Sequence, residues 1–137
     1  MSYDKPNRMR FTHFFDFGAA ADETISIKLP KGKTGRLHNY GVYGVIEVMN
    51  GDSVTPKIAI GTTSDADAYG DELDINAVAD NDAKSVRSEN YENSTNFNAL
   101  MIERDLPKDT EIYMTLTGAT GSPTGQGTAF VDIDVAD

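Results

Sequence analysis

The sequence predicts an all-β fold, an antiparallel β-sandwich or jelly roll of about seven or eight strands with an extended N-terminal arm. Short stretches alternate apolar with polar residues, which is the period of a strand whose side chains point to opposite faces in turn. Glycine, proline and asparagine gather between these stretches, where turns are expected. No stretch shows the spacing of an amphipathic helix, so strands account for the core.

The clearest alternation lies in the last 28 residues. Its apolar positions are Ile112, Met114 and Leu116 in the first stretch and Ala129, Val131, Ile133 and Val135 in the second. Gly118–Gly127, which joins them, has turn chemistry and no charged residue. We therefore expect Glu111–Thr117 and Thr128–Val135 to form an antiparallel pair, half-buried on the core.

The chain begins with Met1–Arg10, which is polar and carries several cations, and we expect an extended arm there. Residues 11–137 are expected to form a single β-sandwich domain. Its first strand should run from Phe11 to Phe17, with Phe11, His13, Phe15 and Phe17 on one face.

Further strands are expected at Thr24–Leu29, at Gly35–Met49 and at residues 56–61. Gly41 and Gly44 predict a bulge or bend within the long stretch. Asn50 and Gly51 form a strong turn signal, and Ala99–Ile102 predicts another strand.

Residues 62–83 carry seven acidic residues and no basic one. Counted from Asp65, the spacing of Asp67 and Gly70 matches a calcium loop, but Tyr69 stands at the fifth position, which needs aspartate or asparagine, and Asn76 stands at the twelfth, which needs glutamate. A solvated acidic loop is the commoner outcome, and a cation bound by Asp65–Asp74 stays an open alternative. Residues 76–98 are mostly polar, and we expect a functional excursion or short elements there.

The chain has 137 residues, no cysteine and a net charge of −10. The charge is uneven, with net +2 in residues 1–57 and net −12 in residues 58–137. An acidic chain repels phosphate backbones, so we expect no nucleic-acid partner. No apolar run approaches the length of a bilayer span, and no apolar stretch follows the first ten residues, so we expect neither a membrane partner nor a secretory signal.

The chain offers few groups for catalysis. Its only histidines are His13, among phenylalanines, and His38, which has only Glu47 as a nearby carboxylate. A metal site of the cupin type needs several histidines in one strand motif, which His38 alone does not supply. We therefore expect no enzyme, no catalytic residue, no metal ligand and no cofactor.

Three stretches carry a family resemblance. They are Pro56–Tyr69, in which a strand leads into the acidic loop, Asp109–Thr117 and Thr124–Ile133. With these stretches the chain resembles phage capsid cement or decoration proteins of the jelly-roll type. The resemblance implies a structural virion protein, made in the host cytoplasm and located on the capsid surface. It also implies a homotrimer that binds the major capsid protein and clamps neighbouring capsomers.

Partner-binding residues are expected in the arm, in the first strand and in the polar excursion. The arm offers cations, and the phenylalanines exceed what one strand face can bury, while aromatic residues are enriched in interfaces. The candidates are Lys5, Arg8, Arg10, Phe11, Phe14, Phe15, Tyr91 and Phe97.

The alternative is a carbohydrate-binding β-sandwich module, either calcium-dependent or calcium-independent. Tyr40, Tyr43 or Tyr69 would be the sugar platform, and Asp65–Asp74 would hold the ion. The absence of tryptophan weakens this alternative. A hydrolase ranks third, because no nucleophile or base can be named.

Overall fold

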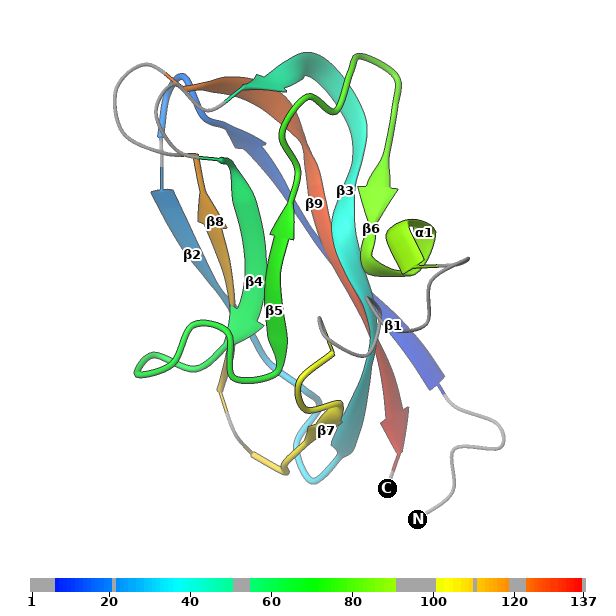
Figure 1. Cartoon of the computed structure of the whole chain (residues 1–137). Helices are drawn as coiled ribbons and strands as arrows, with labels where there is room; N and C mark the ends of the chain where they lie inside the picture. Colours follow the sequence, from blue (N-terminus) through cyan, green and yellow to red (C-terminus); the bar gives the residue numbers. More distant parts are fainter. Residues whose placement is uncertain are drawn as a thin grey trace.

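A computed structural model of the chain shows two β-sheets packed face to face (Figure 1), and it describes residues 7–20, 22–50, 55–90, 101–109, 111–118 and 123–136. The strands within these ranges are β1 (Asn7–Asp16), β2 (Asp22–Ile27), β3 (Thr34–Asn50), β4 (Lys57–Gly61), β5 (Gly70–Asp74), β6 (Lys84–Ser85), β7 (Asp105–Leu106), β8 (Ile112–Thr117) and β9 (Thr124–Ala136). One short helix, α1 (Val86–Asn90), follows β6.

The two sheets have the strand order of a jelly roll. The five-stranded sheet runs β1-β9-β3-β6, with β7 also paired to β3, and the four-stranded sheet runs β2-β8-β4-β5. All pairs are antiparallel, and they are nested: β1 with β9, β2 with β8, β3 with β6, and β4 with β5. This is the pairing of one long hairpin wound into two sheets. The expected all-β sandwich is therefore confirmed.

One expectation about the end of the chain was wrong. β8 and β9 do not pair with each other, because β8 lies between β2 and β4, whereas β9 lies between β1 and β3 in the other sheet. The alternation of apolar residues in each strand is as expected. A period of two shows which face of a strand is buried but carries no information about its neighbours.

The core fills the space between the sheets. Ile112, Met114 and Leu116 of β8 are at most 1% exposed, and Ala129, Val131 and Ile133 of β9 are fully buried. Phe15 and Phe17 belong to this core, with ring centroids 4.8 Å apart. Burial of a large apolar side chain contributes roughly 1.5–3 kcal/mol, so these residues dominate the stability of the sandwich.

The first strand begins earlier than expected. Asn7–Arg10, predicted as part of the arm, pair with Asp132–Val135 of β9. Arg8 and Arg10 alternate with the half-buried Met9, and both arginines face acidic residues across the sheet. Residues 1–6 lie outside the described part of the chain.

The structure also places elements that the sequence pattern did not reveal. β5 lies within the acidic stretch, where a Cβ on Gly70 would lie 2.6 Å from the ring of the buried Tyr40. β6 and α1 lie within the polar excursion. Of the expected strand Ala99–Ile102, residues 99 and 100 lie outside the described ranges, and Met101 forms an isolated bridge to Gly70.

The expected irregularity in β3 is present at one of the two glycines. Gly44 has a φ of 58° and lies where the register with β9 shifts between Tyr43 and Glu47. Gly41 causes no shift, but a Cβ there would lie 2.2 Å from the carbonyl oxygen of Lys84. Gly41 is therefore required for the close approach of β6.

Candidate functional site

The candidate site is the outer face of the five-stranded sheet, which points away from the core. On β1 this face carries Arg8, Arg10, Thr12 and Phe14, and on β9 it carries Thr128, Phe130, Asp132 and Asp134. Each β1 residue lies directly opposite a β9 residue, from Arg8 against Asp134 to Phe14 against Thr128. Such directly opposed side chains are the contacts that stabilise a sheet.

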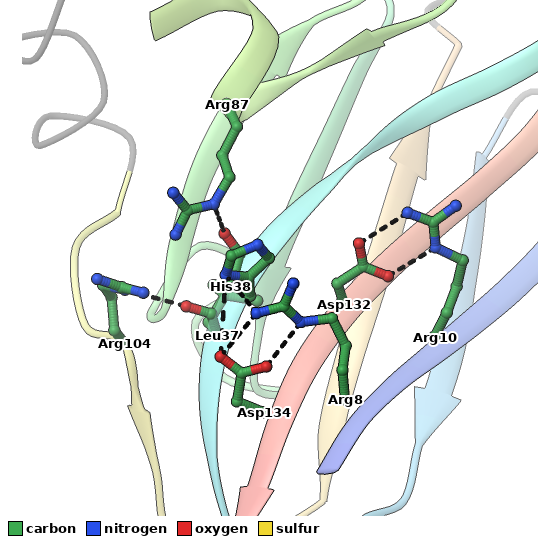
Figure 2. A network of polar contacts seen from close by, with 8 residues as sticks. All are labelled: Arg8, Arg10, Leu37, His38, Arg87, Arg104, Asp132 and Asp134. Carbon is green, nitrogen blue, oxygen red and sulfur yellow. Dashed lines mark hydrogen bonds and ion pairs between the residues drawn. The ribbon is translucent and has the colours of Figure 1, made fainter. Parts of the chain in front are cut away.

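Two arginine–aspartate pairs connect β1 to β9 (Figure 2). Arg10 donates from Nε and Nη2 to Asp132 over 2.7 and 2.8 Å. Arg8 donates from the same two nitrogens to Asp134 over 2.7 and 3.2 Å. Asp132 and Asp134 are only 4% and 7% exposed. Bidentate pairing fixes each guanidinium in one orientation, so the arginines are ordered before any partner arrives.

The electrostatics follow from this pairing. Hydrogen bonds to Asp134 and Asp132 raise the pKa of Arg8 and of Arg10 above their ordinary values. Burial alone raises the pKa of Asp134, but the hydrogen bond from Arg8 and its positive charge lower that pKa by more. Asp134 is therefore ionised at neutral pH despite its burial.

A bulge in β3 adds a histidine and two more arginines. The register with β9 shifts between Leu37 and Asn39, and His38 Nδ1 lies 3.2 Å from Arg8 Nη2. Arg87 of α1 donates to the His38 carbonyl oxygen over 2.6 Å, and Arg104 donates to the Leu37 carbonyl oxygen over 3.0 Å (Figure 2). The bulge thereby anchors α1 and the segment before β7 to the sheet.

His38 lies beside two arginines, Arg8 and Arg87. Its burial and the positive charges of Arg87 and Arg8 lower its pKa, and the negative charges of Asp134 and Asp132 oppose this effect. His38 is therefore neutral at pH 7 and suited to accept the hydrogen bond from Arg8.

Aromatic side chains extend the same face beyond the arginines. The Arg10 guanidinium lies 4.4 Å from the centroid of Phe130 and 5.7 Å from that of Tyr43. The Tyr43 and Phe130 rings meet edge to face at 5.8 Å. Phe14 is 55% exposed and Tyr43 is 37% exposed, and both lie opposite Thr128 on the two sides of β9. This row, Phe14–Thr128–Tyr43, is the aromatic row.

The structure brings three of the eight expected partner-binding residues together on this face, namely Arg8, Arg10 and Phe14. Phe11 is half-buried on the opposite side of β1. Phe15 is 1% exposed and offers no surface to a partner, because it fills the core. Lys5, Tyr91 and Phe97 lie outside the described residues.

Sequence reasoning missed Asp132, Asp134, His38 and Phe130 as parts of the site. A signal was present, because Arg8 and Arg10 have the same spacing as Asp132 and Asp134 and so fit opposite each other on paired strands. This equal spacing indicates a contact only once β1 and β9 are known to be neighbouring strands.

The described surface has one small hollow beside the aromatic row and a larger hollow away from it. One of about 300 Å³ lies beside the aromatic row, bordered by Arg10, Tyr43, Ser85 and Ser88. A larger one of about 760 Å³ lies at the end of the sandwich, between Tyr69 and the Arg36–Asp105 ion pair.

Two of the tyrosines expected as sugar platforms, Tyr40 and Tyr69, are buried or partly buried. Tyr40 is fully buried and donates its hydroxyl to the Asp71 carbonyl oxygen over 2.6 Å, so it cannot be a sugar platform. Tyr69 is partly buried against the core. A hydrogen bond with Asp65, together with burial and the Asp65 charge, raises the pKa of Asp67. Within the described ranges, no three histidine, aspartate or glutamate side chains are arranged to hold a metal ion.

Comparisons with protein families, with curated proteins and with solved structures found no significant match. In the part of the chain that the structure describes, no helix is long and apolar enough to cross a membrane.

Proposed function

We propose that this chain is a structural virion protein, a capsid decoration protein that binds the outer surface of a phage capsid and stabilises contacts between capsomers. The observation that carries the proposal is the outer face of the five-stranded sheet. It presents the exposed Phe14 and Tyr43 beside two arginines that buried aspartates hold in place.

Such a face suits a large protein partner. Aromatic residues and arginine supply most of the binding energy in protein interfaces, where they fill pockets of the partner. The Arg8 and Arg10 side chains are still 47% and 49% exposed, so they can contact acidic groups of a capsid while they stay paired to aspartate. Because their orientation is fixed already, little side-chain entropy is lost on binding.

The test uses particles of the phage whose genome encodes the chain, prepared with the gene of the chain deleted. We expect added wild-type protein to cosediment with the particles and to raise the temperature at which they disassemble. Phe14→Ser and Tyr43→Ser should each weaken particle binding about tenfold or more, as for interface hot spots.

The matched control is Ile102→Ser, since Ile102 is 54% exposed and precedes β7, away from the aromatic row. It should bind as the wild type does. Failure of the wild-type protein to bind the particles would contradict the proposal, and so would equal binding by all variants.

The carbohydrate-binding alternative is favoured by one feature, the hollow of about 300 Å³ beside Tyr43. An aromatic ring flanked by hydroxyl and amide groups is a common arrangement for a sugar. Calorimetry with glycans, with and without calcium, separates the two functions. Glycan binding that Tyr43→Ser abolishes would favour this alternative over capsid binding.

A further inference from the structure

We propose that two copies of this chain associate through β1, edge to edge and antiparallel, about a two-fold axis at Thr12. The two five-stranded sheets then become one continuous sheet. This inference concerns self-association, goes beyond the proposed function and does not depend on it.

β1 is an edge strand of the five-stranded sheet. It is ten residues long, and its register with β9 has no shift from Asn7 to Asp16. Among the described strands, only β9 pairs with it. Natural edge strands avoid pairing by being short, bulged, interrupted by proline or charged, and of these features β1 has only its charges, Arg8, Arg10 and Asp16. Its two arginines, which could repel another copy, are already paired with Asp132 and Asp134.

The sequence of β1 is complementary to itself in one register. With Thr12 on the axis, Arg8 of each copy lies opposite Asp16 of the other, and Arg10 lies opposite Phe14. These are an opposite-charge pair and a cation–aromatic pair, and each occurs twice because of the symmetry. The two Thr12 side chains meet at the centre, where a threonine pair is favourable.

Partly exposed apolar side chains also lie on the inner side of the β1 edge. Met9 and Phe11 of β1 and Ile25 of β2 are apolar and only partly buried. Beside them His13 Nε2 lies 2.7 Å from Glu23 Oε2, which links the edges of the two sheets. In the proposed register Met9 lies opposite Phe15 and Phe11 opposite His13, so the second copy covers this partly apolar seam.

Neighbouring registers fit less well. An axis at Phe11 places Arg8 opposite Phe14 and leaves Asp16 beyond the paired region. An axis at His13 places two histidines against each other, sets Arg10 opposite Asp16 and moves Arg8 past the end of β1, opposite Gly18. A register shifted by one residue would set outer-face residues of one copy opposite inner-face residues of the other. Such a register cannot give a continuous sheet with matching faces. The axes at Thr12 and at His13 both give Asp16 an arginine, but only the axis at Thr12 also gives the second arginine a partner within β1, Phe14, and avoids the histidine pair.

The first test measures the mass in solution by light scattering. We expect twice the 14.9 kDa of one chain for the wild type. Thr12 is exposed, so Thr12→Lys and Thr12→Glu leave the fold intact but place like charges against each other on the axis, weakening self-association at least tenfold. An equimolar mixture of the two variants should recover the dimer. Thr24→Lys is the matched control, on the exposed side of β2, an edge strand of the other sheet, and should stay dimeric.

The second test uses the absence of cysteine from the chain. Directly opposed residues of an antiparallel pair have Cα atoms about 4.5–5.5 Å apart, within the range that a disulfide spans. Thr12→Cys should therefore form a covalent dimer on mild oxidation, and Thr24→Cys should not.

A wild type that stays monomeric up to a chain concentration of roughly 1 mM would overturn the proposal. So would a trimer whose mass Thr12→Lys leaves unchanged, which is the assembly implied by the resemblance to decoration proteins. If the wild type is monomeric but still binds particles and loses that binding with Phe14→Ser, self-pairing is wrong and the proposed function stands.

Discussion

Asp132 and Asp134 show how single residues determine the character of the outer face. A carboxylate that is less than a tenth exposed is costly unless it is paired and hydrogen-bonded. Each has a bidentate arginine directly across the strand pair. Removal of an arginine would leave its aspartate charged, buried and unpaired. Removal of an aspartate would leave an arginine that is still half exposed to water and so loses little stabilisation. The acidic residues of β9 therefore hold the arginines of β1 in place.

His38 gives this face a dependence on pH. Its folded-state pKa lies below the ordinary value of 6.5, because of burial and of Arg87 and Arg8. As the pH falls through 6.5, the unfolded chain binds a proton that the folded chain does not, so the free energy of unfolding decreases. The decrease is at most about 1.4 kcal/mol per pH unit.

Denaturant unfolding between about pH 7.5 and 5 measures this decrease in wild-type protein and in His38→Gln, whose amide can still accept from Arg8. We expect the variant to lose the part of the pH dependence that His38 contributes. His13→Gln, which retains His38, should keep that part. Equal pH profiles for wild type and His38→Gln would show that the histidine keeps its ordinary pKa.

Among the elements, β9 shows what the sequence predicts and what it does not. Its apolar residues at Ala129, Val131 and Ile133 correctly identify the core face. The same alternation suggests that Asp132 and Asp134 face water, yet both are buried beneath arginines of β1. Burial of the polar face depends on the neighbouring strand, and strand order arises from contacts between residues more than a hundred positions apart.

The candidate site was predicted in part for the same reason. Arg8, Arg10 and Phe14 were singled out as cations and surplus aromatics, which composition alone reveals. Their role as an ordered face depends on pairing with β9 and on the bulge at His38. β5 has only five residues, and its one large apolar residue, Leu73, lies between two acidic residues. This pattern resembles a solvated loop, so the sequence did not predict a strand there.

The pairing of β6 with β3 depends on one glycine. A Cβ at position 41 would lie 2.2 Å from the Lys84 carbonyl oxygen, which is backbone and cannot turn aside. We expect Gly41→Ala to lower the free energy of unfolding by about 2–3 kcal/mol, as for other overpacked sites. Amide hydrogen exchange at Lys84, which pairs with Val42 of β3, should accelerate, since β6 is forced away.

Gly44→Ala is the comparison. A Cβ there meets open space, but the φ of 58° disfavours any other residue by about 1–2 kcal/mol. Its loss of stability should leave exchange at Lys84 unchanged. Rapid exchange in both variants would mean that Gly41 acts through the strand as a whole and not through the contact with Lys84.

At the scale of the whole molecule, capsid binding by the aromatic row and pairing through β1 are compatible in one arrangement. Pairing of β1 edges places two copies of the aromatic row on the same side of one continuous sheet, related by a two-fold axis. A two-fold dimer presents two equal contact surfaces, which suits a protein that connects two neighbouring capsomers. The second contact then becomes intramolecular, so affinity for the particle gains from effective concentration without any new contact.

This gain is measurable. Thr12 lies on the outer face but outside the aromatic row, and Thr12→Lys should weaken the apparent affinity for particles roughly 10²-fold through loss of the second contact. The equimolar mixture with Thr12→Glu, which restores the dimer, should recover that affinity. Phe14→Ser should weaken both the single and the paired contact. Binding curves of both variants on gene-deleted particles test this, with Thr24→Lys as the control that retains wild-type affinity. If Thr12→Lys is dimer-deficient but binds as tightly as the wild type, each copy holds the capsid alone, and the edge of β1 contributes nothing to the strength of attachment.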